Sequence, residues 1–170
     1  ALDGAPPIMS MVGDQQASLV GQGCISPGKT KITFGTGGML DVFIGSQPPA
    51  RAQRSTGGTF PIVAFSTSTE IFYGAEAIML SAGTNIDWLC TDMQLIDSPE
   101  HSHDVASQVD TSDGVVYVPA LLGLGTPKWD YGARGTLLGI TRGTSRAHIV
   151  RAVLEGIAHR GADMVDASQA

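Results

Sequence analysis

The sequence predicts a single α/β domain, on three observations. The chain has 170 residues, of which 42% are hydrophobic, so it is long enough to bury a sizeable core. Short segments rich in β-branched and aromatic residues fill much of its first half. Longer segments follow in which apolar residues recur at helical spacing. Strands followed by long helices are typical of the α/β class.

The N-terminal segment is predicted to hold a linker and two short elements. Residues 1–7 contain two prolines and have the composition of a linker. An apolar strand is expected over 8–12 and a short helix over 15–22. Asp14 is therefore expected at the end of a strand.

The following elements are predicted to be strands. Segments 30–34 and 39–44 flank a glycine-rich turn and predict a β-hairpin. Residues 45–58 contain two adjacent prolines and have loop composition, so an insertion or mobile loop is expected there. Strands are then expected over 59–65 and 69–73 because both segments are rich in β-forming residues.

A helix is predicted over 75–96, where apolar residues lie close to helical spacing. Gly83 would weaken the middle of this helix. Close approach of a ligand, which leaves no room for a side chain, would explain a glycine at this point. The polar residues 98–112 predict a short surface helix and a turn.

The last part of the chain is predicted to end in a long helix. A strand over 115–118, a glycine- and proline-rich loop up to residue 135 and a strand over 136–140 precede it. Thr144 or Ser145 can cap the helix. Its apolar stripe consists of Ile149, Val150, Val153, Leu154, Ile157 and Met164.

Composition narrows the classes of partner. A net charge of −6, with only 10 Lys and Arg residues, argues against binding to nucleic acid or to an anionic membrane surface. Cys24 and Cys90 lie far apart and lack a CxxC spacing, so reduced thiols are expected. No leader and no apolar run long enough to span a membrane is visible. We therefore expect a soluble cytoplasmic protein that acts on a small molecule.

Two segments close together in sequence carry candidate chemistry. Glycines at 35, 37 and 38 would let backbone N–H groups turn toward an anion such as a phosphate. Asp14 could accept a proton from a hydroxyl nucleophile, or could simply cap the helix that follows it. Gln15 could orient a substrate hydroxyl, since its amide both donates and accepts, or could be a solvated residue.

Two other patterns suggest sites that their context disfavours. Residues 23–30 satisfy GxxxxGK[ST], but a P-loop needs a strand before the first glycine and a helix at the lysine, whereas a strand is predicted after Lys29. His101, His103 and Asp104 lie in a polar segment with no third ligand at suitable spacing, so a solvated loop is expected there instead of a metal site.

Longer motifs identify a family. The blocks GDQQASLVGQG (13–23) and PGKTKITFGTG (27–37) resemble the start of the C-terminal domain of FGGY carbohydrate kinases, in their glycerol kinase branch. SAGTNIDWL (81–89) and the block from 116 to 155 extend this resemblance. Within the last block, matching positions are Gly135, Leu137, Gly139, Ile140, His148, Ile149, Ala152 and Glu155.

The resemblance implies a fold and a missing partner domain. It implies half of an actin-like, RNase H-like ATPase fold, with a mixed sheet and flanking helices. Residues 1–170 would be part of the nucleotide-binding C-terminal domain, truncated after the helix at 150–166, where the family continues into elements that carry more of the adenine site. An N-terminal kinase domain should precede it, and homo-oligomers are common in the family.

The resemblance also implies roles for individual residues. Asp14 falls on the position of the catalytic base and could help to hold Mg²⁺, and Gln15 falls on a substrate contact. The nucleotide, ATP, would lie against Gly35, Thr36, Gly37, Gly83 and Asp87. The implied reaction is ATP-dependent phosphorylation of a polyol or sugar hydroxyl; a non-catalytic nucleotide-binding module of the actin-like superfamily is the alternative.

Two positions depart from the pattern of the glycerol enzymes. Met39 stands where those enzymes tend to present an aromatic side chain to the substrate carbons, and methionine defines a shape less strictly. Asp87 stands where they typically carry Gln, which adds a negative charge near an anionic ligand. The substrate therefore stays open between glycerol and another polyol or sugar, such as a tetritol or a ketopentose.

Overall fold

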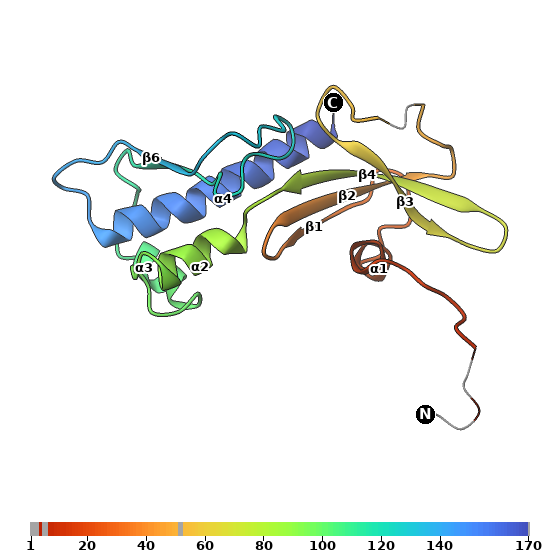
Figure 1. Ribbon diagram of the computed structural model, residues 1–170, viewed down its shortest axis with the longest axis horizontal. Coiled ribbons are helices and arrows are strands. Elements are labelled where there is room, and N and C mark those ends of the chain that lie inside the picture. Colours follow the sequence, from red (N-terminus) through yellow and green to blue (C-terminus); the bar gives the residue numbers. More distant parts are fainter. Residues whose placement is uncertain (1–3, 5–6, 51–52, 170) are drawn as a thin grey trace.

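The computed structural model describes residues 4, 7–50 and 53–169 and consists of one larger antiparallel sheet, a smaller two-stranded sheet and four helices (Figure 1). In chain order the elements are α1 (Asp14–Gly21), β1 (Thr30–Phe34), β2 (Gly38–Gly45), β3 (Phe60–Ser66), β4 (Ile71–Met79), α2 (Gly83–Thr91), α3 (His101–Ala106), β5 (Val116–Val118), β6 (Thr136–Leu138) and α4 (Arg146–Ser168).

The larger sheet has the strand order β1-β2-β4-β3, and every neighbouring pair in it is antiparallel. β5 and β6 form the smaller sheet. β1 is therefore an edge strand, and no strand lies along its outer side among the described residues. Ile32 and Phe34 on this strand are 36% and 53% exposed.

Helices cover both faces of the larger sheet (Figure 1). On one face, Leu19 of α1 packs in a cluster with Phe43 and Ala64. On the other face, Met164 of α4 packs with Leu40, among other residues of β2 and β4. Because Leu40 and Phe43 are separated by an odd number of positions on β2, their side chains point to opposite faces. This arrangement of helices around a sheet agrees with the predicted α/β class.

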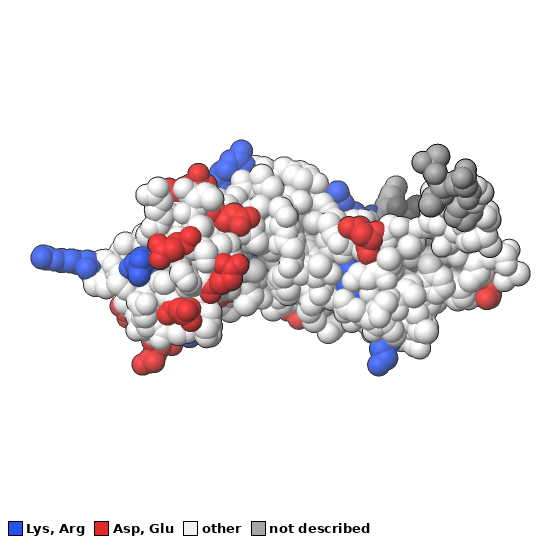
Figure 2. Space-filling view, turned by 90° about the horizontal axis from the view of Figure 1, so that it is seen from below, with Lys and Arg blue, Asp and Glu red and all other residues white. Residues whose placement is uncertain are grey.

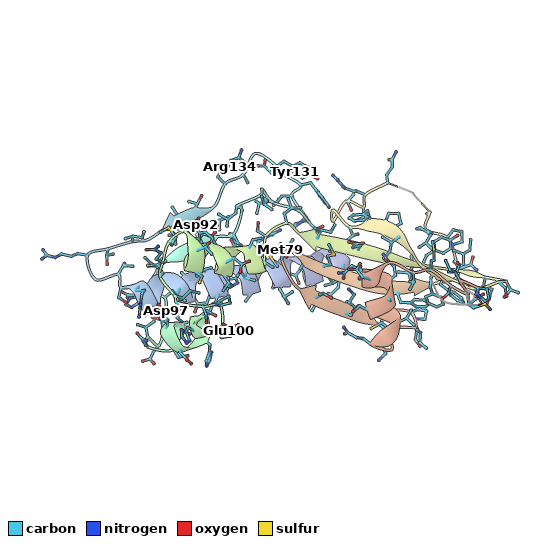
Figure 3. The ribbon with its side chains drawn as sticks, turned by 60° about the horizontal axis from the view of Figure 1, so that its bottom comes forward. Met79, Asp92, Asp97, Glu100, Tyr131 and Arg134 are labelled. Carbon is cyan, nitrogen blue, oxygen red and sulfur yellow. The ribbon has the colours of Figure 1, made fainter. Side chains whose placement is uncertain are left out.

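The loop between β5 and β6 is anchored along its length. The Arg160 guanidinium donates to the Thr126 carbonyl, and the Trp129 indole N–H donates to the Gly58 carbonyl at 2.6 Å. Figure 3 shows Tyr131 and Arg134 on this loop, well away from Asp97 and Glu100 near α3. These contacts tie the loop to α4 and to the segment before β3.

Two predicted elements are wrong. Residues 8–12 form no strand, and Ile8 and Met11 are 82% and 86% exposed, because no described strand lies beside them. Asp14 consequently opens a helix instead of ending a strand. Residues 75–79 belong to β4, where they pair with β2, so the predicted helix over 75–96 begins only at Gly83 and ends at Thr91.

The other elements are confirmed with shifts of a few residues. The hairpin of β1 and β2 and the short α1 lie where they were expected. Ser145, and not Thr144, is the N-cap of α4, where its side chain and that of His148 form a reciprocal capping box. The linker predicted for 1–7 falls largely outside the described residues. Within the described part of the chain, no helix is both long enough and apolar enough to cross a membrane.

Candidate active site

The glycine turn between β1 and β2 is tied to the start of α2 through its carbonyl groups. The N–H of Gly83 donates to the Gly35 carbonyl at 2.8 Å, and the N–H of Ala82 donates to the Thr36 carbonyl at 2.9 Å. The amide and hydroxyl of Thr84 also point at the Thr36 carbonyl. The first N–H groups of α2 are therefore occupied by the turn and are not free for a ligand.

The amide groups of the turn itself have a different environment. Among the described residues, we find no acceptor for the backbone N–H groups of Thr36 and Gly37. A Cβ on Gly35 would meet nothing closer than 3.9 Å, so space is open beside the turn. Unpaired amides in a glycine turn are well suited to phosphate oxygens. The N–H of Gly35 is not among them, because it donates to the Gly37 carbonyl at 2.8 Å. A nucleotide contact at Gly35, Thr36 and Gly37 stays a prediction.

The structure gives a reason for the glycine at position 83 that differs from the predicted close approach of a ligand. A Cβ at this position would lie 2.7 Å from the Gly35 carbonyl oxygen. The close neighbour that excludes a side chain is thus the backbone of the glycine turn, and not a ligand. Gly83 still bears on the site, because its contact holds the turn in place.

An apolar hollow of about 280 Å³ lies beside the turn. It is lined by Phe34, Gly35, Ala82, Gly83, Ile86, Leu154 and Ile157, so β1, α2 and α4 all contribute to it. Asp87 is exposed and lies one helical turn after Gly83 on the same side of α2. A flat apolar group such as a purine ring could occupy this hollow while a phosphate met the turn.

Acidic residues continue beyond Asp87 toward the end of α2 and α3. Asp92, Asp97, Glu100 and Asp104 are all exposed. Figure 2 shows acidic side chains gathered over this end of the molecule. A polyanion that approached Asp87 from this side would be repelled.

Asp14 and Gln15 occupy the first two positions of α1, on the other face of the sheet from α4. Asp14 is exposed, and its Oδ1 accepts the N–H of Gln15 at 2.8 Å, while Gly13 is the N-cap. The local bond resembles the capping role considered for Asp14, and the second carboxylate oxygen has no partner in the part of the chain that the structure describes. Among the described residues, no group of three His, Cys, Asp or Glu side chains could hold a metal ion.

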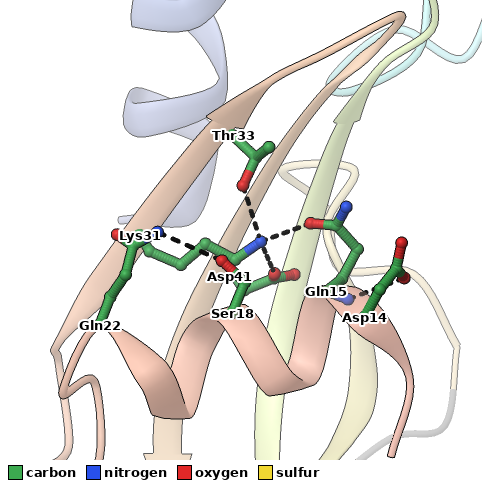
Figure 4. A network of polar contacts seen from close by, with 7 residues as sticks. All are labelled: Asp14, Gln15, Ser18, Gln22, Lys31, Thr33 and Asp41. Atoms are coloured by element: carbon green, nitrogen blue, oxygen red, sulfur yellow. Dashed lines mark hydrogen bonds and ion pairs between the residues drawn. The ribbon is translucent and has the colours of Figure 1, made fainter.

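Gln15 is joined to a buried ammonium group. Lys31 Nζ donates to Gln15 Oε1 at 2.5 Å and to Thr33 Oγ1 at 3.0 Å, and it forms an ion pair with Asp41 Oδ2 at 2.8 Å (Figure 4). The side chains of Lys31 and Asp41 are both 0% exposed. Because Thr33 is two residues before Gly35, this network lies about 7 Å along the strand from the glycine turn.

Met39 and Glu76 complete this face of the sheet. Met39 is half-buried and is the register partner of Thr33, so it lies beside the end of the Lys31 network that is nearer the turn. Lys31, Asp41 and Glu76 are register partners across β1, β2 and β4. Burial, and to a lesser extent the nearby Asp41 carboxylate, raise the pKa of Glu76 to about 7, against the lowering effect of Lys31.

Sequence reasoning missed Lys31, Asp41 and Glu76. For Lys31 and Asp41 the available signal was a charged residue inside a predicted strand, where an inward-facing position is normally apolar. Glu76 had no such signal, because residues 75–96 were predicted to form a helix. The other patterns are settled by the structure. Thr30 begins a strand and no helix starts at Lys29, which rules out the P-loop. His101 and His103 are exposed and lie in the short helix α3, so the solvated loop expected for them is wrong.

Comparisons with known proteins identify the family. Residues 30–170 match the model of the FGGY family of carbohydrate kinases, C-terminal domain. This range includes the glycine turn, Met39, Gly83 and Asp87, whereas Asp14 and Gln15 precede it. The chain is 44% identical over 161 residues to glycerol kinases of Oceanobacillus iheyensis and Shewanella amazonensis, covering 95% of this chain. It spans only 31% and 32% of those relatives.

Solved structures give the same result. A Plasmodium falciparum glycerol kinase with ADP matches with a TM-score of 0.80 and 35% identity, over 92% of this chain and 30% of that one. A ligand-bound xylulose kinase from Lactobacillus acidophilus matches with a TM-score of 0.72 and 26% identity, over 88% and 29%. These neighbours confirm the predicted actin-like α/β fold. The chain belongs to the FGGY family of carbohydrate kinases and resembles its glycerol kinases.

Proposed function

We propose that the protein containing this chain transfers the γ-phosphoryl group of ATP to a hydroxyl of a small polyol or sugar, most simply glycerol. The observation that carries this proposal is that Asp14 and Gln15 lie on the same face of the sheet as Thr33 and Met39, which lead toward the glycine turn. Among the described residues, Asp14 Oδ2 and the amides of Thr36 and Gly37 have no partner. Family membership supports the same reaction.

In this proposal Asp14 accepts the proton of the attacking hydroxyl. The hydroxyl oxygen forms a bond to the γ-phosphorus as the bond between that phosphorus and the β,γ-bridging oxygen breaks, so ADP leaves. Thr36 and Gly37 offer N–H groups to phosphate oxygens, and the side chain of Met39 borders the substrate carbons. The hollow beside Gly83 and Asp87 would receive the nucleoside.

The residues present also fit a magnesium ion. Mg²⁺ in such sites keeps several waters and takes only one or two carboxylates, together with the phosphates of the substrate. The free oxygen of Asp14 can serve as one such ligand, directly or through water. When bound, the ion would neutralise charge on the phosphates.

The test is a coupled ADP-release assay on the full-length protein with glycerol, erythritol, xylulose and ribulose. We expect turnover with one of them and a loss of 100-fold or more, on the order expected for a general base, in Asp14→Asn. Asparagine retains the Oδ1 that accepts the Gln15 N–H, so the helix start is preserved.

Asp166→Asn, an exposed change on α4, is the control and should leave turnover unchanged. Turnover that survives in Asp14→Asn would contradict the assignment of the base. Tight ATP binding without turnover on any of the four substrates would favour the non-catalytic nucleotide-binding module.

A further inference from the structure

We infer that Lys31 is a positioning residue, which turns the Gln15 amide so that its NH₂ group, and not its oxygen, faces the substrate hydroxyl. This inference rests on the proposed function and adds to it the means by which Gln15 is oriented. Its basis is the buried network that joins Lys31 to Gln15, Thr33 and Asp41 (Figure 4).

The chemistry of the ammonium group decides which end of the amide it contacts. A lysine ammonium has three donors and no acceptor, whereas a glutamine amide has one accepting oxygen and one donating nitrogen. Lys31 Nζ can therefore bind only the oxygen of Gln15, which it does. Among the described residues, Gln15 Nε2 has no acceptor, so its two N–H groups are available to a ligand.

The position of the ammonium group is itself fixed. The group donates hydrogen bonds to Gln15 and Thr33 and forms an ion pair with Asp41 at 2.8 Å, so it is held from three sides. Asp41 is its register partner on the neighbouring strand, so the ion pair spans adjacent strands of the sheet. Since the Lys31 side chain is 0% exposed, it cannot reach a substrate and acts only through Gln15.

Gln15 and the adjacent Asp14 would then contact the substrate hydroxyl in two different ways. Gln15 would donate a hydrogen bond to the oxygen of the substrate hydroxyl, while Asp14 would accept its proton. An amide turned the other way would present an oxygen to the same site and compete with Asp14 for that proton. Lys31 excludes this orientation.

A double-mutant cycle on the full-length protein tests the inference. Removing Lys31 alone would leave the Asp41 carboxylate buried without a partner, so the variant is the pair Lys31→Met/Asp41→Val, which replaces a buried ion pair by apolar side chains. We expect the polyol KM to rise about 3- to 10-fold, the range of one hydrogen bond, with the ATP KM changed less than about 2-fold.

The same pair of substitutions is then made in a Gln15→Ala background. If Lys31 acts through Gln15, the polyol KM should change less than about 2-fold there, because nothing is left to orient. An equal rise in both backgrounds would show a structural role only and overturn the inference. Lys29→Met, the same substitution at an exposed position beside β1, is the control and should leave the polyol KM unchanged in both backgrounds.

A second variant keeps the test decisive if the paired variant fails to fold. Gln15→Glu retains an oxygen for Lys31 but presents a second oxygen outward in place of the NH₂ group. We expect a polyol KM raised at least about 10-fold with an unchanged melting temperature. An unchanged polyol KM would overturn the inference. A wild-type protein without turnover on any polyol or sugar would instead refute the proposed function, and the inference with it.

Discussion

Glu76 is a buried carboxylic acid whose charge depends on pH close to neutrality. Burial raises its pKa from 4.5 to about 7. Between these values the folded state holds a proton that the unfolded state has released. The contribution of Glu76 to the free energy of unfolding is therefore largest below pH 4.5, falls as the pH rises to 7 and is constant above that.

Glu76→Gln, a neutral side chain of similar shape, should remove this dependence. Relative to the wild type, we expect the variant to gain stability between pH 5 and pH 8, by at most about 3 kcal/mol. The measurement is the urea midpoint of both full-length proteins across this range. A difference between the two that stays constant with pH would contradict the shifted pKa.

Asp87 places a negative charge beside the hollow proposed for the nucleoside. Asp87→Gln should lower the KM for ATP about threefold at low ionic strength, because an unfavourable Coulombic contact with the phosphates is removed, and the gain should shrink as salt is added. Asp92→Asn, an exposed change farther along the same helix, is the matched control. An ATP KM equal to that of the wild type at low salt would show that the phosphates lie elsewhere.

At the level of residues, the sequence predicted those parts of the candidate site that form short motifs. The glycine turn and the adjacent Asp14 and Gln15 were visible as motifs. The contact of Lys31 with Gln15 was not, because it depends on the angle at which α1 crosses the sheet. Register between strands, which no local pattern specifies, brings Asp41 and Glu76 into the same row.

The turn between β1 and β2 and the start of α2 form one structural unit. Gly83→Ala should disrupt it, because the new Cβ would lie 2.7 Å from the Gly35 carbonyl oxygen. We expect a loss of about 1–3 kcal/mol in stability and weaker nucleotide binding by the full-length protein. Thermal melting with and without ADP, and nucleotide titration by calorimetry, would measure both effects.

Gly21→Ala provides the comparison for this substitution. Gly21 ends α1, and a Cβ there would meet nothing within 4 Å. Alanine should therefore be neutral or slightly stabilising, by up to about 1 kcal/mol. Equal losses from Gly83→Ala and Gly21→Ala would mean that packing against the turn does not explain the glycine at position 83.

Elements were predicted well where two signals agreed. The β1–β2 hairpin combines alternating residues with a glycine turn, and α4 combines a capping serine with a long apolar stripe. The prediction failed for residues 75–79, where small and apolar residues fit a helix as well as a strand and only pairing with β2 decides. The predicted strand over 8–12 is absent because a β-strand also needs a neighbouring strand to pair with, and none of the described strands lies beside this segment.

On the scale of the whole molecule, this chain holds only part of the proposed machinery. It spans about a third of the relatives it matches. We predict that the isolated 170 residues are inactive, because other substrate and phosphate contacts would come from the missing N-terminal kinase domain. Polyol-dependent ADP release by these residues alone, in the assay described above, would refute this.

Several properties of the whole protein remain predictions. These are its cytoplasmic location, a possible homo-oligomer and the lack of a nucleic-acid partner. The acidic surface over α2 and α3 supports the last of them, since it would repel a phosphate backbone (Figure 2).

The exposed edge of β1 has a practical consequence for work on the isolated chain. No other strand in the described part of the chain pairs with the outer edge of β1, and Ile32 and Phe34 on β1 are partly exposed. Such an edge is a template on which a second molecule can add its own strand. Self-association of a preparation of these 170 residues would then report on that edge. It would say nothing about the number of subunits in the full-length protein, which has to be determined with that protein.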